Sequence, residues 1–92
     1  MNVAEFIKKA TELGLSKGYP ALKTRKKLDS HRAAHYRGVV VFMLYSFGDL
    51  EKYEIREMTT LGHNNIDYWL NKIGGLIDIK DPETIEALND LL

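Results

Sequence analysis

The side chains best suited to chemistry in this sequence are the polar residues of the stretch from position 63 to position 73. They are His63, Asn64, Asn65, Tyr68 and Lys72. An asparagine side chain offers an acceptor and two donors, which matches the N7 and N6 edge of adenine in the major groove of DNA. A lysine can contact a phosphate, which positions a protein on a duplex. The residue types therefore predict that His63, Asn64, Asn65 and Tyr68 lie at base edges of duplex DNA and that Lys72 contacts a phosphate.

Two short helices are expected to position these side chains. Four apolar residues in the second helix fall at i, i+3, i+4 and i+7, the spacing of one helix face: Ile66, Trp69, Leu70 and Ile73. Ile55, Met58 and Leu61 give the preceding helix its own apolar face, and Gly62 stands at the joint, where a sharp corner needs unusual backbone angles. The stretch 53–73 thus predicts a helix-turn-helix, whose second helix enters the major groove. The alternative is an ordinary helical hairpin in which the polar residues only cap a helix.

The segment Ser30–Ile73 resembles the C-terminal duplex-binding domain of the bacterial replication initiator DnaA. The shared features are a basic stretch (KTRKK at 23–27), Arg32 opening an apolar helix, a Glu-Ile pair at 54–55, and a histidine that opens the recognition helix. His63-Asn64-Asn65-Ile66 stands where that family has His-Thr-Thr-Val, Gly62 replaces the family's aspartate, and the turn is one residue shorter. The base sequence that the family recognises is therefore not carried over.

The resemblance implies a phosphate-binding role for the basic residues before the helix-turn-helix. Together with Lys72, the expected phosphate contacts are Lys23, Arg25, Lys26, Lys27 and Arg32. The same basic run could instead be a solvated helix face, which is the commoner fate of such clusters. DnaA also carries an ATPase module, whereas this chain has no glycine-rich phosphate loop, so the resemblance implies a free-standing DNA reader.

The remaining pattern predicts an all-α single domain (residues 1–92) of about five helices. A first helix is expected over Asn2–Leu13, with Gly14 as its stop, and a short one over Ala21–Leu28. The central helix should run from a cap at Asp29 or Ser30 to Phe47, although the β-branched run 39–41 could form a buried strand. The stretch 74–75, Gly-Gly, is expected to end the recognition helix, leaving 76–79 as a connector. Asp81-Pro82-Glu83 predicts the start of an acidic C-terminal helix, about 82–92.

Composition excludes several classes of function. The 92 residues contain no cysteine, which excludes disulfides and thiolate metal sites. His31 and His35 have the i, i+4 spacing of metal ligands, but Arg32 occupies the place where a zinc protease needs glutamate, so we expect no metal and no cofactor. With no apolar run of membrane-spanning length, no signal-peptide pattern and no nucleophile motif, we expect a cytoplasmic protein that is not an enzyme.

The net charge of zero conceals an asymmetry between the two halves of the chain. Residues 1–40 hold nine Lys or Arg and three acids, whereas residues 41–92 hold four and ten. The acidic C-terminal helix should be repelled by DNA, so it is expected on the far side of the fold or against a protein partner.

The sequence therefore predicts a sequence-preferring double-stranded DNA-binding protein, a regulator of replication or transcription from a phage, plasmid or bacterium. The alternative is a small helical adaptor for protein–protein interaction, which keeps the fold without the DNA contacts.

Overall fold

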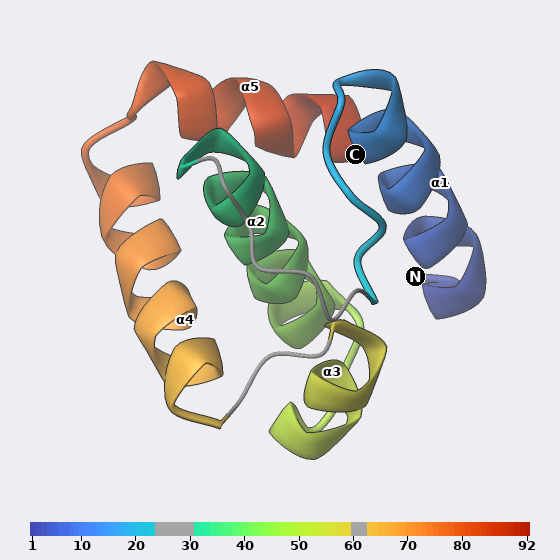
Figure 1. Cartoon of the computed structure of the whole chain (residues 1–92). Coiled ribbons are helices and arrows are strands. Elements are labelled where there is room, and N and C mark those ends of the chain that lie inside the picture. Colours follow the sequence, from blue (N-terminus) through green and yellow to red (C-terminus); the bar gives the residue numbers. More distant parts are fainter. Residues whose placement is uncertain (24–30, 60–62) are drawn as a thin grey trace.

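The computed structural model describes residues 1–23, 31–59 and 63–92, except for the side chains of His63 and Asn64. It shows a compact all-α globule, as the sequence predicts (Figure 1). The described residues form five helices: α1 (Val3–Ser16), α2 (His31–Phe47), α3 (Lys52–Thr59), α4 (His63–Asp78) and α5 (Pro82–Leu91). None of these helices is long and apolar enough to cross a membrane.

Helix α2 is the centre of the fold, and all four other helices pack against it. Figure 1 shows it surrounded by α4 and α1 on opposite sides, α5 across its beginning and α3 near its end. Val39, Val40 and Val41 are completely buried, because neighbouring helices cover α2 on several sides. This segment is helical, so the alternative of a buried strand is wrong. Covering a helix all round favours apolar residues at consecutive positions, which hides the usual periodicity.

Helices α2 and α4 approach closely where Gly38 meets Trp69. A Cβ atom added at Gly38 would lie 2.3 Å from Cε3 of the Trp69 indole. Glycine is normally unfavourable in the middle of a helix, by about 1 kcal/mol relative to alanine. Here its missing side chain makes room for the indole ring, and this packing fixes the inner face of α4 against α2.

The first helix continues past Gly14, so the prediction that this glycine ends it is wrong. Gly14 is buried in α1, where an added Cβ would lie 3.0 Å from Cε2 of Tyr36. The helix ends instead at Ser16, and Gly18, two residues further on, has a left-handed φ of 84°. The Tyr19 amide donates to the Gly14 carbonyl and the Gly18 amide to the Leu15 carbonyl, which is the Schellman arrangement of a helix C-terminus.

Helix α4 also runs further than its glycines predict. Gly74 and Gly75 are both helical, and the expected connector 76–79 begins with the last turn of the helix. The chain turns at Lys80 (φ 56°), where the Asp81 amide donates to the Leu76 carbonyl. Asp81 then caps α5 as predicted, accepting a hydrogen bond of 3.0 Å from the Thr84 amide.

The short helix predicted for Ala21–Leu28 is not present at its beginning. Residues 21–23 are not helical, and the rest of that prediction lies outside the described residues. The same holds for the proposed caps Asp29 and Ser30 and for the turn glycine Gly62.

Candidate nucleic-acid interface

Helix α4 carries an exposed polar stripe along one side. Asn65, Tyr68 and Lys72 are exposed and fall at i, i+3 and i+7, so they lie close to one line along the helix. Ile66 and Ile73 are completely buried on the opposite side. The predicted inner and outer faces of this helix are therefore confirmed for the residues whose side chains the structure describes. Trp69 lies at the border between them, packed on the core but only partly buried.

The ammonium group of Lys72 is held beside two aromatic rings. Its Nζ donates a 3.2 Å hydrogen bond to the hydroxyl of Tyr68. It also lies 5.5 Å from the centroid of the Tyr68 ring and 5.3 Å from that of Trp69, within the range of cation–π attraction. The two rings meet edge to face, with centroids 5.2 Å apart. These contacts restrict the lysine, so less conformational entropy is lost when it binds an anion.

A cavity of about 430 Å³ adjoins the stripe, and we call it the α2–α4 pocket. Its walls come from the start of α2, the middle of α4 and the first turn of α5: His31, Arg32, Ala34, His35, Tyr68, Trp69, Lys72 and Glu83. Arg32 and Lys72, two of the predicted phosphate contacts, thus share one site although they are 40 positions apart in the sequence. Tyr68, a predicted base-edge residue, also lines this pocket and is about half exposed.

The other predicted contacts divide into two groups. Lys23 is exposed at a different cavity, which it shares with residues of α1 and α3 such as Thr11 and Glu57. It is therefore not part of the α2–α4 pocket. Predictions for Arg25, Lys26 and Lys27 lie outside the described residues. His63 and Asn64 are the first two residues of α4, but their side chains also lie outside the described part of the chain.

Two carboxylates near the stripe differ in their surroundings. Asp67 lies on the other flank of α4, where it forms a 2.6 Å ion pair with Lys52 of α3. Its hydrogen bond and charge raise the pKa of Lys52. Glu83 of α5 lines the α2–α4 pocket itself. The first turn of the acidic helix therefore lies beside the predicted phosphate contacts Arg32 and Lys72, and its expected position away from DNA stays a prediction.

His35 takes part in a polar connection between α2 and α5 that the sequence did not reveal. Its Nε2 lies 2.8 Å from the Thr84 hydroxyl oxygen, and that hydroxyl lies 2.8 Å from a carboxylate oxygen of Asp81. The hydrogen bonds from the Thr84 hydroxyl and amide lower the pKa of Asp81, and the charge of His35 contributes least. No group of three or more potential metal ligands occurs among the described residues.

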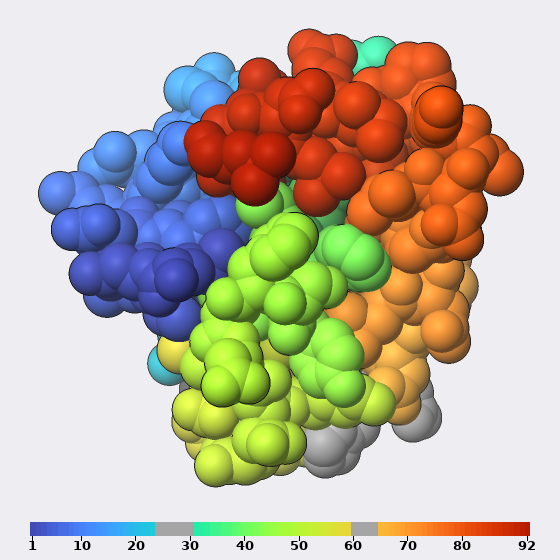
Figure 2. All heavy atoms as spheres, turned by 180° about the vertical axis from the view of Figure 1, so that it is seen from behind, coloured from blue at the N-terminus to red at the C-terminus, as the bar shows by residue number. Residues whose placement is uncertain are grey.

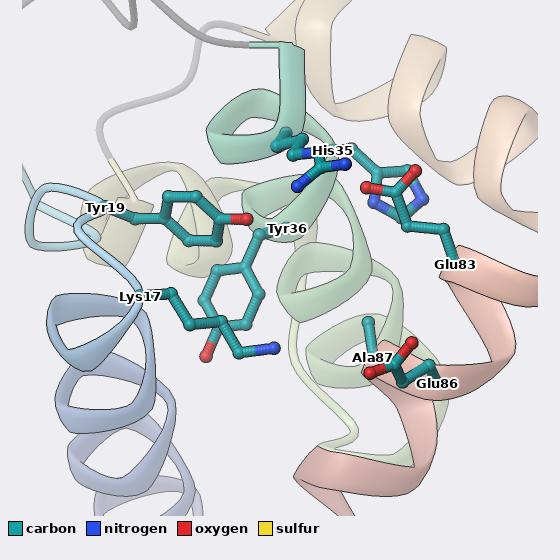
Figure 3. A pocket seen from close by; sticks show the side chains of 8 residues that line it. Lys17, Tyr19, His35, Tyr36, Glu83, Glu86 and Ala87 are labelled. Carbon is teal, nitrogen blue, oxygen red and sulfur yellow. The ribbon is translucent and has the colours of Figure 1, made fainter.

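His35 and Arg32 also line a neighbouring cavity of about 320 Å³ (Figure 3). The figure shows Lys17, Tyr19 and Tyr36 on one side and Glu83 and Glu86 of α5 on the other. The Tyr36 hydroxyl donates a 2.6 Å hydrogen bond to the Ala10 carbonyl. Burial, with the charge of Asp90, raises the pKa of Tyr36 to about 12. Tyr36 therefore stays protonated and joins α1 to α2.

Comparison with protein-family models, curated proteins and solved structures gives no significant match to this chain. The assignment of a function consequently depends on the exposed stripe of α4, the α2–α4 pocket and the charges around them.

Proposed function

We propose that this chain binds double-stranded DNA with a preference for sequence, using α3 and α4 as a helix-turn-helix. Three residues separate α3 from α4, and both helices pack on α2. This three-helix arrangement supports the assignment, because it leaves the outer face of the second helix free to enter a major groove. The stripe from Asn65 to Lys72 would extend about 10 Å along the groove, at about 1.5 Å per residue.

The main support for this proposal is that predicted phosphate contacts and predicted base-edge contacts lie on one surface of the protein. Arg32 and Lys72 share the α2–α4 pocket, and Asn65 and Tyr68 continue the same stripe along α4. Cations beside a polar helix face provide what a groove-binding helix needs, namely phosphate contacts at its edge and hydrogen-bonding groups at the base edges. Asp67, which would oppose a phosphate, is paired with Lys52.

The resemblance to the DnaA duplex-binding domain supports the same proposal, since its recognition-helix signature coincides with the start of α4. By analogy, the protein would act in the cytoplasm as a regulator of replication or transcription. It would use a binding surface and not a catalytic centre.

A role in protein–protein interaction is the second candidate, and it is favoured by an apolar surface away from the stripe. A cavity of about 330 Å³ is lined by residues of α1, α2 and α5, including Phe6, Met43 and Leu91. Met1, Phe47 and Leu92 at its rim are all more than half exposed. Figure 2 shows the meeting of the N-terminal segment, the end of α2 and the C-terminus on this side of the molecule. Exposed apolar groups gathered in this way are typical of protein-binding surfaces.

Binding to DNA should depend steeply on salt. If four to six basic side chains neutralise phosphates, log K should fall against log salt with a slope of about −4 to −5. The measurement is a fluorescence-anisotropy titration of a labelled duplex of randomised sequence, repeated from low to physiological salt. In the double variant R32Q/K72Q, the slope of log K against log salt should be less negative by about two. K8Q, which removes an exposed lysine of α1, is the matched control. Absence of binding to any duplex at low salt would remove the proposal.

A further inference from the structure

We propose that the α2–α4 pocket is a site for one phosphate group and that His35, in its protonated form, is the third ligand beside Arg32 and Lys72. The inference rests on the proposed function in one respect, since it takes a backbone phosphate of DNA as the natural occupant. The site itself, however, is argued from the geometry of the pocket. It also predicts something that DNA binding alone does not, a dependence of affinity on pH.

The hydrogen bonds around His35 determine which ring nitrogen keeps its hydrogen in both protonation states. The Thr84 hydroxyl has one hydrogen, which it donates to Asp81 at 2.8 Å. It must then accept a hydrogen from Nε2 of His35, also at 2.8 Å. The imidazole therefore carries a hydrogen on Nε2 in both protonation states, and Nδ1 is the nitrogen whose hydrogen comes and goes. A fixed tautomer of this kind is usual where a carboxylate or hydroxyl orients a histidine.

Nδ1 can form a hydrogen bond to a phosphate oxygen in only one of its two protonation states. In the neutral ring, Nδ1 is an acceptor, so it cannot bond to a phosphate oxygen, which is also an acceptor. In the protonated ring, Nδ1 becomes a charged donor, and such hydrogen bonds to phosphate are among the strong ones. His35 is thus able to act as a phosphate ligand only after it gains a proton.

The charges facing His35 make its proton a large part of the net positive charge of the pocket. The titratable and charged groups around it come from every neighbouring element: His31, Arg32 and Tyr36 of α2, Tyr68 and Lys72 of α4, Asp81, Glu83 and Glu86 at α5, and Lys17 and Tyr19 beside α1. In the pocket itself, two permanent cations, Arg32 and Lys72, face one carboxylate, Glu83. A proton on His35 therefore doubles the net positive charge of the groups in the pocket.

The connection to α5 places a carboxylate close to the ring of His35. Asp81 has a lowered pKa, so its carboxylate remains ionised at neutral and mildly acidic pH. Its negative charge lies one hydroxyl away from the imidazole. Since an imidazole that gains a proton becomes a charged donor, phosphate binding should strengthen as the pH falls.

The first test is the affinity for a randomised duplex at pH 8.0 and pH 5.5 at one salt concentration. The wild type should bind about tenfold more tightly at the lower pH, the value of one charge-assisted hydrogen bond. The glutamine of H35Q can still donate a hydrogen bond to Thr84 but cannot become charged. The affinity of H35Q for DNA should therefore rise by less than about twofold from pH 8.0 to pH 5.5. D81N keeps a side chain that can cap α5 and loses the carboxylate, so its gain should lie between these two values. D81N also tests the proposal if H35Q proves unfolded by circular dichroism.

The second test uses dimethyl phosphate, a phosphate diester that is a monoanion at both pH values, without DNA, and follows the imidazole signals of His35 by NMR. Saturable shifts at pH 5.5 that need a higher concentration of the diester at pH 8.0, and that are weakened in R32Q, would support the site. If the shifts occur but no duplex binds, the phosphate site stands and the proposed function fails. If DNA binds equally at both pH values in the wild type and in H35Q, the phosphate site fails and the proposed function stands. A pH dependence that persists in H35Q and is lost in H31Q or H63Q would also overturn the role of His35.

Discussion

Replacing Gly38 by alanine should lower the free energy of unfolding by about 1–3 kcal/mol, the usual cost of overfilling a packed interior. Helix propensity alone would act in the opposite direction, by about 1 kcal/mol. The clash should win because an added Cβ would lie 2.3, 2.7 and 2.9 Å from three atoms of the Trp69 ring. An indole is rigid, so contact at that distance is relieved only by moving the ring or the whole of α4.

Urea unfolding followed by circular dichroism would measure this change. G75A is the matched control, since Gly75 is also helical and an added Cβ there meets nothing within 4 Å. G75A should therefore stabilise the protein, by up to about 1 kcal/mol. In the background of W69L, the smaller side chain should make G38A neutral or stabilising. If G38A alone stabilised the protein as G75A does, the packing of α4 on α2 described above would be wrong.

Asn65 and Lys72 should affect DNA binding in different ways, although both lie on the stripe of α4. N65A should cost about 1–3 kcal/mol on the preferred sequence and little on scrambled DNA, because contacts to base edges carry specificity. K72Q should weaken binding to both duplexes about equally and reduce the steepness of the salt dependence by about one, because a phosphate contact is independent of sequence.

The experiment begins with a selection from random duplexes, which supplies the preferred sequence. Affinities of the variants are then compared on that sequence and on a scrambled version. N89A on the exposed surface of α5 and K8Q on α1 are the controls, and neither should change the ratio of the two affinities. Equal losses for N65A on both duplexes, or a selection that yields no preferred sequence, would contradict the assignment of α4 as the recognition helix.

The sequence predicted the five described helices and the faces of α4, because those depend on local spacing, but it also predicted a helix from Ala21 that is not present at its beginning. Ile66 and Ile73 are buried and Asn65 and Lys72 are exposed, as the helical period requires. Helix ends were predicted less well, because glycine has two different uses in this chain. Gly14 and Gly38 make room for aromatic rings inside helices, whereas Gly18 is the one glycine of the described residues that supplies a left-handed turn.

The end of α4 was also difficult to predict, because the residue that ends it is not a glycine. Lys80 adopts a left-handed φ of 56° after the helix, and lysine is not a residue that signals such a turn. The hydrogen bond from the Asp81 amide to the Leu76 carbonyl closes this turn.

The candidate site was predictable only in part. Arg32 and Lys72 were each singled out from the sequence, but their meeting in one pocket depends on the way in which α4 crosses α2. The contribution of α5 to this pocket could not be foreseen, since the contact of His35 with Thr84 joins residues 49 positions apart. The spacing of His31 and His35 drew attention to metal binding, whereas the structure connects His35 to a hydroxyl of α5.

Binding of DNA through α4 can be examined by an NMR titration of ¹⁵N-labelled protein with a short duplex of randomised sequence at low salt. We expect saturable shifts in the amide signals of Asn65–Lys72 and of His31 and Arg32, while the signals around Phe47 and Leu92 remain in place. Shifts gathered around Phe47 and Leu92, or no shifts with any duplex, would contradict this expectation.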